Sequence, residues 1–378
     1  MRYILSLILI CLLISSLNAS FQSTLFNKMN KEKKGDNLII SPLSIFQILS
    51  LTTNGAKGQT LTEMLELLQC ENIDQLNQIN YRILIAFEKF STIDIANAIM
   101  TKFTPVEEFT TVAEKYLATI EPLISVDQVN EWCYNKTHGK IDKILKELDP
   151  LTLIILINAV YFKGEWRSKF QSTLTKPLPF YNLGSEEVNV DTMIQIAHFN
   201  YYEDKNVQAI ELNFREDYMS AIIILPAEGT DINKYIDTLS ISNSEYKKII
   251  DGLKYSKVHI QLPKFELRFE QKLNEILKDL GMYDAFIPYV ANFTGLREEG
   301  DLYISQVIHK TYLKVFEDGC EAAAVTIVDG AGGAMPVQET IYDMKINRPF
   351  LFLLKNSILP AGNDWYLCQK LKNLNKCY

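Results

Sequence analysis

Apolar residues recur at helical spacing in several stretches of the chain. These run from residue 22 to 34, from Asp74 to Phe90 and from Val129 to Gly139. Such spacing is typical of helices that pack one face on a core, and Gly is a common helix end. A further helix is expected between Phe265 and Gly281. The first three stretches are therefore predicted to be helices, and the fourth is predicted to contain one that ends at Gly281.

Two more helix starts are marked by capping residues. Residues 37 to 45 indicate a short strand that runs directly into a helix, because Ser41 is a good N-cap and Pro42 is tolerated in the first turn. Thr60 and Glu63 have the spacing of a capping box. This spacing predicts that Thr60 caps the next helix.

A different pattern predicts strands. Residues Leu153 to Phe162 are nearly all apolar and rich in β-formers, which is typical of a strand buried on both faces. Asn158 is the polar exception, and a buried amide without partners would cost about 1–3 kcal/mol, so we expect it to have partners. Met219–Leu225 and Lys257–Leu262 are further strands. Together with the helices they favour an α+β fold with large antiparallel or mixed sheets.

The segment from Glu317 to Pro336 has two contrasting halves. Positions 320, 322, 324, 326 and 328 are all small or uncharged, whereas Glu321 and Asp329 fall on the other parity. A strand with this pattern would have one face that can be buried. Residues 330–334 are Gly-rich, which predicts an exposed, mobile stretch. Composition alone fits an Ala-rich helix followed by a linker equally well.

Length and charge narrow the class of protein. The chain has 378 residues and a formal net charge of −8, which argues against nucleic acid and anionic lipid as partners. Residues 1–19 combine one basic residue, an apolar run and small residues at the end, which predicts a signal peptide cleaved after Ala19 and a secreted protein. The alternative, a membrane anchor, would need about 20 apolar residues. No linker or repeat divides residues 20–378, so a single domain is expected.

Cysteine and asparagine positions add expectations for a secreted chain. Beyond the predicted leader, the five cysteines are an odd number at irregular spacing, so at least one thiol stays free, although Cys368 and Cys377 are able to bridge. Asn135 and Asn292 begin acceptor sequences for N-glycosylation.

Several motifs, in order, resemble one protein family. Residues 317–326, Glu-Asp-Gly-Cys-Glu-Ala-Ala-Ala-Val-Thr, resemble the hinge of the reactive-centre loop of inhibitory serpins. Residues 347–350, Asn-Arg-Pro-Phe, are similar to the segment that closes that loop, and residues 37–60 and 158–170 resemble two other serpin motifs. The resemblance covers roughly Thr24 to Phe352. It fades at 365–371, where the family usually has a Gly-containing strand and this chain has none, although a strand is still expected.

The resemblance implies a serpin fold and an inhibitory mechanism. The fold has a large central mixed β-sheet, further sheets, about nine helices and an exposed reactive-centre loop at about 317–346. A serine protease would cut the loop, and the amino-terminal arm would then insert into the central sheet while the protease is still attached as an acyl-enzyme. The hinge would comprise Glu317, Gly319, Cys320, Glu321, Ala322, Ala323, Ala324 and Thr326.

The family positions also imply two supporting sites. A polar cluster that governs opening of the sheet would comprise Ser41, Ser44, Asn158 and His309. Trp166, Lys264 and Glu317 would meet where insertion begins, with Lys264 pairing Glu317.

The bond to be cut lies in the window Gly333, Ala334, Met335, Pro336, Val337 and Gln338. Met335 suits a chymotrypsin-like or cathepsin G-like protease, although Pro336 after it is a poor leaving residue. Cleavage after Gly333 or Ala334 would suit an elastase-like protease. The window has no basic residue, which argues against trypsin-like targets.

Other functional classes leave no signal in the sequence. We find no nucleophile elbow, zinc-binding motif or phosphate loop, so no enzyme activity, metal or cofactor is expected. The expected partner is a target serine protease bound covalently to a monomer. Only Arg82 and Lys89 are basic in the stretch that binds heparin in antithrombin-like serpins, so no heparin site is expected. The alternatives are a non-inhibitory serpin-fold binding or carrier protein and, third, a secreted hydrolase.

Overall fold

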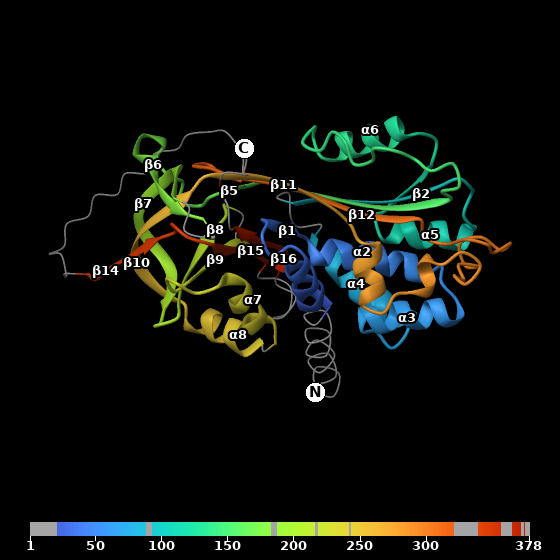
Figure 1. Cartoon of the computed structure of the whole chain (residues 1–378), viewed down its shortest axis with the longest axis horizontal. Helices are drawn as coiled ribbons and strands as arrows, with labels where there is room; N and C mark the ends of the chain where they lie inside the picture. The colour runs from blue at the N-terminus through green and yellow to red at the C-terminus, as the bar shows by residue number, and fades with distance from the viewer. Residues whose placement is uncertain are drawn as a thin grey trace.

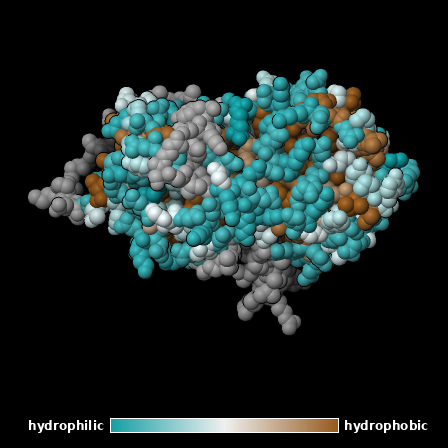
Figure 2. Space-filling view, in the orientation of Figure 1, coloured by the Kyte–Doolittle hydropathy of each residue, from teal (hydrophilic) through white to brown (hydrophobic). Residues whose placement is uncertain are grey.

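The structure is a computed structural model of the chain. It describes residues 21–87, 93–182, 187–215, 218–241, 243–320, 339–356, 365–371 and 374. Two large β-sheets lie side by side along the long axis, each with its own helices (Figure 1). On the face shown in Figure 2 the described surface is mostly hydrophilic, with small scattered apolar patches.

The first sheet has five strands and lies between two layers of helices. Its order is β11 (Phe265–Lys272), β12 (Gln306–Val315), β4 (Ile154–Phe162), β2 (Ile93–Thr101) and β3 (Thr119–Pro122). Helix α6 (Val126–Lys136) covers one face (Figure 1). The opposite face packs on a helical group made of residues 21–32, α2 (Pro42–Thr53), α3 (Gly58–Leu68), α4 (Ile73–Phe87) and α5 (Glu107–Lys115).

The second sheet has nine strands and forms the other half of the molecule. Its order is β1 (Leu38–Ile40), β16 (Trp365–Leu371), β15 (Phe350–Asn356), β9 (Met219–Pro226), β8 (Val207–Asn213), β7 (Glu187–Glu203), β10 (Lys254–Pro263) and β14 (Ile341–Lys345), and β6 (Lys176–Tyr181) pairs with β7. The remaining helices are α7 (Ile232–Ile241), α8 (Asn243–Gly252) and α9 (Asn274–Asp279). The described residues thus contain nine α-helices, in agreement with the expected number.

Strand β4 lies at the centre of the five-stranded sheet and is buried along its whole length, as its composition predicts. Its even-numbered apolar residues, such as Leu156 and Val160, belong to the main core. Its odd-numbered residues, such as Ile157 and Ala159, belong to a second core beneath α6. The period of two along a strand therefore divides β4 between two cores.

One predicted helix start is wrong. Helix α3 begins at Gly58, after Lys57, and not at a capping box made by Thr60 and Glu63. Tertiary contacts use both side chains instead. The Thr60 hydroxyl accepts from the backbone N–H of Asn292 at 3.0 Å, and the Glu63 carboxylate accepts from two backbone N–H groups near residue 283.

Other predicted boundaries are close to those observed. Ser41 caps α2, with Pro42 in the first turn. The helix expected at 129–139 is α6, which begins three residues earlier and ends at Lys136, and Gly139 follows with a left-handed φ of +77°. Residues 365–371 form β16 although they lack the expected Gly. Among the helices of the described chain, none combines the length and apolar character that a membrane crossing requires.

Candidate functional site

The candidate site begins where two parallel strands meet in the middle of the five-stranded sheet. Strands β4 and β12 run parallel, with Asn158 opposite His309. Their outer neighbours, β2 and β11, pair with them antiparallel. A strand placed between β4 and β12 and running against both would make two antiparallel ladders in place of one parallel ladder. Antiparallel pairing is slightly the more stable of the two per residue.

A buried polar cluster lies beneath this junction. It contains all four residues expected there: Ser41, Ser44, Asn158 and His309, which are each about 1% exposed or less. The Ser44 hydroxyl lies 2.8 Å from Asn158 Oδ1, and His309 Nδ1 lies 2.5 Å from the same oxygen. The backbone N–H of Ser41 donates to His309 Nε2 at 3.2 Å. The cluster thus ties both central strands to the start of α2.

Two members of this polar region have no signal in the sequence. The Asn158 amide donates to Asn97 Oδ1 on β2 at 2.6 Å, and the Thr311 hydroxyl donates to the backbone carbonyl of Ile39 at 3.1 Å. Asn97 lies opposite Asn158 in the β2–β4 register. These partners depend on how the strands pair. They could be predicted only from the alternation of side chains along each strand together with a known register between the strands.

The hydrogen bonds fix the protonation of His309. Because Nε2 accepts from Ser41, the proton resides on Nδ1 and is donated to Asn158 Oδ1. Burial disfavours the imidazolium and lowers the pKa of His309 to about 3. The ring is therefore neutral at physiological pH and serves as a structural hydrogen-bonding group.

At the end of β12 the chain reverses direction in a tight turn. The backbone N–H of Phe316 donates to the carbonyl of Gly319 at 2.9 Å, and the N–H of Gly319 donates back to Phe316 at 3.1 Å. The next strand, β13 (Gly319–Cys320), pairs antiparallel with β5 (Gly164–Glu165), which continues β4. Gly319 thus lies between Phe316 and Glu165. The β4–β12 register, when extended, would place those two residues opposite each other, so Gly319 already occupies the junction.

Close backbone contacts make glycine necessary at position 319. Its φ is +143°, and a Cβ there would come within 2.0 Å of the Gly164 carbonyl oxygen. Beside it the Trp166 indole donates to the carbonyl of Phe316 at 3.0 Å and stacks on Phe214, with ring centroids 4.6 Å apart. The Trp166 indole therefore holds the turn in place through Phe316, where insertion is expected to begin.

Charged groups hold the two residues at the tip of the turn. Lys264 Nζ lies 3.1 Å from Glu317 Oε1, and the Thr175 hydroxyl donates to the same oxygen at 2.8 Å. Burial would raise the pKa of Glu317, but the hydrogen bonds from Thr175 and Lys264 outweigh it and hold that pKa below its usual value. Lys169 Nζ lies 3.3 Å from Asp318 Oδ1. Thr175 and Lys169 were not expected from the sequence, because Thr175 lies in a stretch without a distinctive pattern and the resemblance of residues 158–170 implied no role for Lys169.

Some expected site residues lie outside the described part of the chain. These are the hinge positions Glu321, Ala322, Ala323, Ala324 and Thr326, the window Gly333, Ala334, Met335, Pro336, Val337 and Gln338, and Cys377. The same holds for the side chains of Cys320 and Cys368. Cys70 and Cys133 are buried free thiols, and burial raises the pKa of each to about 12.

The two expected glycosylation sites differ in accessibility. Asn135 is exposed near the end of α6, whereas the hydroxyl of Thr137, the third residue of its acceptor sequence, is buried against the carbonyl of Cys133. Asn292 is partly buried, and its Oδ1 accepts from the hydroxyl of Thr294 at 2.8 Å. Within the described residues no group of three His, Cys, Asp or Glu side chains is placed to hold a metal ion.

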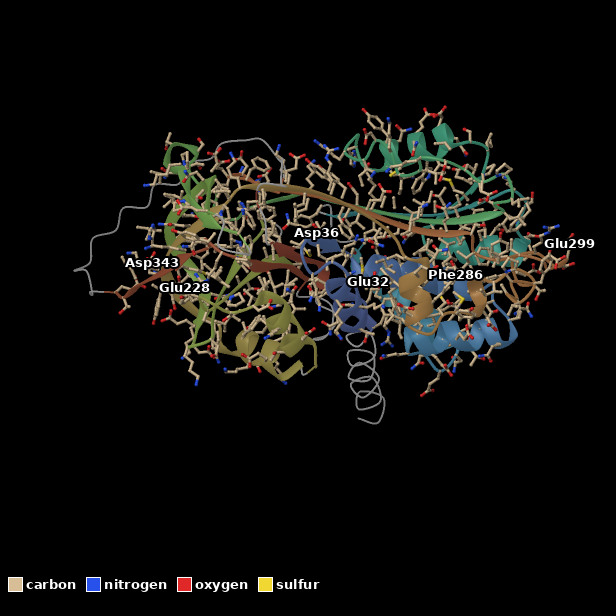
Figure 3. All side chains as sticks on the ribbon, viewed as in Figure 1. Glu32, Asp36, Glu228, Phe286, Glu299 and Asp343 are labelled. Atoms are coloured by element: carbon tan, nitrogen blue, oxygen red, sulfur yellow. The ribbon has the colours of Figure 1, made fainter. Side chains whose placement is uncertain are left out.

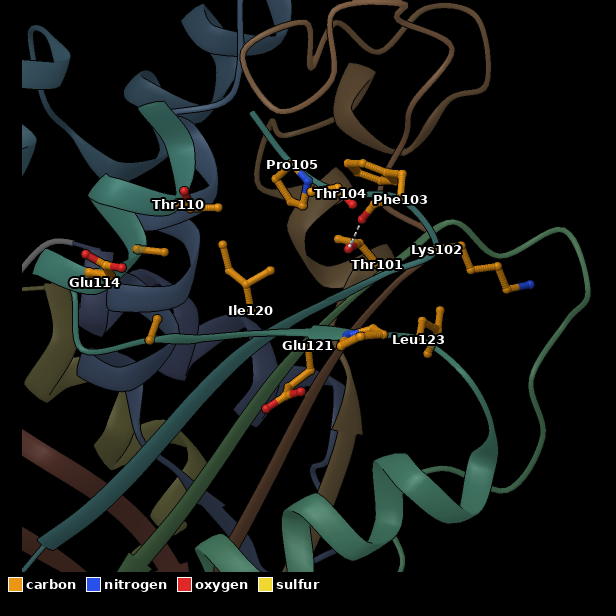
Figure 4. Close-up of a pocket in the computed structure, with 13 residues that line it drawn as sticks. Thr101, Lys102, Phe103, Thr104, Pro105, Thr110, Glu114, Ile120, Glu121 and Leu123 are labelled. Carbon is orange, nitrogen blue, oxygen red and sulfur yellow. Dashed lines mark hydrogen bonds between the residues drawn. The ribbon is translucent and has the colours of Figure 1, made fainter. Parts of the chain in front are cut away.

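A separate recess lies at the other end of the five-stranded sheet (Figure 4). It has a volume of about 760 Å³ and lies between the end of β2, α5 and β3. The Thr101 hydroxyl donates to the carbonyl of Phe103 at 2.6 Å, and Lys102 Nζ donates to the carbonyl of Pro150 at 2.7 Å. None of the expected site residues lines this recess, so it is not part of the candidate site.

Comparison with known proteins identifies the family. A model of the serpin (serine protease inhibitor) family matches residues 16–361. The chain belongs to the serpin family. A leukocyte elastase inhibitor of Xenopus tropicalis is 30% identical to this serpin over 365 residues, which cover 91% of this chain and 96% of that protein.

Solved structures show that the fold is the serpin fold. The crystal structure of tengpin, a thermophilic serpin, in the native state matches this serpin with a TM-score of 0.83 and 32% identity, and the match covers 95% of this chain and 94% of tengpin. Human thyroxine-binding globulin matches with a TM-score of 0.85 and 24% identity over 96% of this chain and 98% of that one. The second likeness concerns the fold alone.

Proposed function

We propose that this serpin is a secreted suicide-substrate inhibitor of a chymotrypsin-like or elastase-like serine protease. The protease serine attacks a carbonyl carbon in the window 333–338, the C–N bond breaks, and the amine leaves with a proton. The amino-terminal arm then remains joined to the protease as an ester. Insertion of that arm between β4 and β12 carries the protease along before water hydrolyses the ester.

The position of Gly319 carries this proposal. Gly319 lies opposite Glu165 on one side and Phe316 on the other. If both registers continue, residue 326 comes to lie opposite both Asn158 on β4 and His309 on β12. These two residues are already opposite each other. The arm is therefore able to enter the sheet with no register slip in either neighbouring strand.

The same register gives each inserted residue a suitable environment. Opposite residues in a ladder share a face of the sheet, so even-numbered hinge residues face the main core with residues such as Leu156 and Val160. These hinge residues are small and uncharged. The Thr326 hydroxyl would join the Asn158–His309 cluster. Glu321 would lie between Lys163 and Lys314, which places its charge between two opposite ones.

The expected driving force is large compared with the stability of a domain. About a dozen new backbone hydrogen bonds at about 1 kcal/mol each would favour the inserted state by ten or more kcal/mol. Buried alanine and valine methyl groups would add to this. A single buried unpaired charge would remove several kcal/mol and slow an insertion that must be faster than deacylation.

Several further properties belong to the same proposal. Residues 1–19 would be a signal peptide, and residues 20–378 would form one domain that acts as a monomer, without cofactor, metal or heparin and without catalytic activity of its own. Asn135 and Asn292 would be the glycan positions. Asn135 is the more accessible of the two.

A panel of proteases tests the proposal. The mature chain would be incubated with chymotrypsin, cathepsin G, neutrophil elastase and trypsin, then analysed by denaturing electrophoresis and mass spectrometry. We expect a detergent-resistant complex with at least one of the first three and none with trypsin, together with a released carboxyl-terminal peptide whose mass gives the scissile bond. Cleavage by every protease without any complex would refute inhibition.

The second candidate is a serpin-fold carrier. The likeness to thyroxine-binding globulin shows that the fold alone does not decide between the two. The hinge favours inhibition, because residues 322–324 are alanines and no charge or proline occupies an even-numbered position from 320 to 328.

A further inference from the structure

A recess next to the nine-stranded sheet has features of a ligand site that the inhibitory mechanism does not use. Three segments far apart in the sequence line it: the end of β6 at 181–182, the turn 226–231 between β9 and α7, and residues 347–349 between β14 and β15. The volume is about 620 Å³, within the range of about 300–1,000 Å³ that is usual for small-molecule sites. Glu228, labelled in Figure 3, marks the turn that forms one wall.

Backbone hydrogen bonds join two of the three segments to each other and close the third as a turn. The N–H of Tyr181 donates to the carbonyl of Asn347 at 2.8 Å, which joins β6 to the third segment. The turn from Ala227 to Thr230 is closed by a backbone hydrogen bond of 3.1 Å, and Gly229 adopts a φ of +79° within it. The recess is therefore formed by ordered backbone.

Arg348 contributes an incompletely paired cation to the recess. Its Nε donates to the carbonyl of Pro226 at 2.9 Å, and Nη1 donates to Asn347 Oδ1 at 3.2 Å. A guanidinium has five N–H groups, so three have no acceptor among the described residues. No described carboxylate lies within ion-pair distance, although burial lowers the pKa of Arg348 and Glu228 counteracts this. A planar oxyanion would supply the missing acceptors and the missing charge.

Asn182, which also lines the recess, has a second donor without a partner among the described residues. It is 3% exposed, and its Oδ1 accepts from the backbone N–H of Leu374 at 3.0 Å, which fixes the orientation of the amide. Its Nδ2 is buried and has no acceptor among the described residues. A buried donor without a partner is unfavourable. Arg348 therefore supplies the donors of the recess, and Asn182, which also lines it, keeps a buried donor unpaired.

The turn 226–231, which also lines the recess, carries negative charge. Glu228 is exposed on the turn and forms no ion pair with a described residue. Asp231 also lines the recess, and its Oδ1 accepts from the N–H of Asn233 at 2.9 Å. With one cation and two carboxylates, the recess has a net negative charge. It should therefore bind a simple anion less tightly than a molecule that carries both a negative and a positive charge.

We infer that this recess binds a small zwitterion of the amino-acid or short-peptide class. The carboxylate of the ligand is held by Arg348, and its ammonium group faces Glu228 and Asp231. This site does not depend on the hinge, so it would exist whether or not the serpin inhibits a protease.

The test uses three related peptides that differ in their charged ends, and inorganic phosphate. Glycylglycine carries both charges, N-acetylglycylglycine only the carboxylate, glycylglycinamide only the ammonium group, and inorganic phosphate is a simple anion. Binding to the intact mature chain would be measured by saturation-transfer NMR and titration. We expect glycylglycine to bind in the millimolar range and at least tenfold more tightly than the other three.

Three variants distinguish ligand binding from a purely structural role of the arginine. Arg348→Gln should weaken glycylglycine binding at least about tenfold, and Glu228→Gln, on an exposed turn, should weaken it several-fold without affecting the fold. Arg82→Gln, at a partly exposed arginine on α4 that lies outside the recess, should leave binding unchanged. If Arg348→Gln unfolds, Glu228→Gln alone decides the outcome. The inference is overturned if glycylglycine does not bind, if phosphate or the acetylated peptide binds equally well, or if folded Arg348 and Glu228 variants bind like the unmodified chain.

Discussion

The polar residues beneath the β4–β12 junction are buried, and they satisfy one another's hydrogen-bonding groups. His309 is the clearest case, because its two ring nitrogens link the start of α2 to Asn158 on the neighbouring strand. The ring performs this role only while it is neutral. Its charge state therefore connects the stability of the sheet to pH.

The depressed pKa of His309 predicts a loss of stability in mild acid. A histidine in the unfolded chain has a pKa of about 6.5, whereas burial lowers the pKa of His309 to about 3. Its contribution is therefore fully present above pH 6.5 and is lost as the pH falls from 6.5 towards 3, by about 2 kcal/mol between pH 7 and pH 5. Urea unfolding of the intact chain at the two pH values would measure this.

The matched variants are His309→Gln and His138→Gln, since His138 is exposed and lies outside the cluster. The first should show a pH dependence smaller by about 2 kcal/mol, and the second should behave like the unmodified chain. Equal pH dependence in all three proteins would contradict the neutral, buried assignment.

At the scale of elements, β13 gives the pairing from which the proposed insertion would continue. Its two residues are paired with β5, and the same register, if continued, would assign partners on β4 and β12 to positions 321–328. The effect of a single hinge substitution on inhibition can therefore be predicted from the partners of that position.

Position 324 tests which hinge face is buried on insertion. The continued register places Ala324 between Val160 and Thr311, which are both buried. Ala324→Arg would bury an unpaired charge, at a penalty of several kcal/mol, so this variant should be cleaved as a substrate and form no stable complex. Ala324→Ser should still form the complex in the same electrophoretic assay. A stable complex with Ala324→Arg would show that the parity is wrong.

Position 321 tests the register itself. Glu321→Lys would place a third positive charge between Lys163 and Lys314 and should raise the number of inhibitor molecules consumed per protease inactivated. Each exposed pair contributes only about 0.2–1 kcal/mol, so a severalfold change is expected. Adding Lys314→Glu should reverse part of the effect, whereas Glu298→Lys, on an exposed loop, should have none. Failure of Lys314→Glu to compensate would argue against this register.

The sequence predicts strongly patterned elements well and tertiary choices poorly. The apolar run of β4 and the Ser41–Pro42 helix start are local signals, so both were predictable. The start of α3 was not, because Thr60 and Glu63 bond to residues more than 200 positions away.

The candidate site shows the same division. The family motifs bring Lys264 to Glu317 and His309 to Asn158, as the resemblance implied. The partners Thr175 and Asn97 depend on loop placement and strand register, which one sequence does not encode locally. The position of Gly319 between Phe316 and Glu165 likewise follows only from the pairing of β13.

At the scale of the whole molecule, we propose that the fold is held above its lowest free energy. Strands β4 and β12 of the five-stranded sheet are in parallel contact, and a segment with the composition of a further strand follows the end of β12 in the sequence. The uncut loop is joined at both ends, through β13 and β14, to different sheets. Cleavage would free one end and allow the sheet to expand.

The most direct measurement is the melting temperature before and after a single cut in residues 333–338. We predict a rise on the order of 20 °C for the cleaved chain, from a gain of ten or more kcal/mol, and little change for cleaved Ala324→Arg. Amide hydrogen exchange on the same samples should show new protection at residues 320–328 only in the first. A cleaved chain that melts at the temperature of the intact one, with those amides still exchanging freely, would contradict the account.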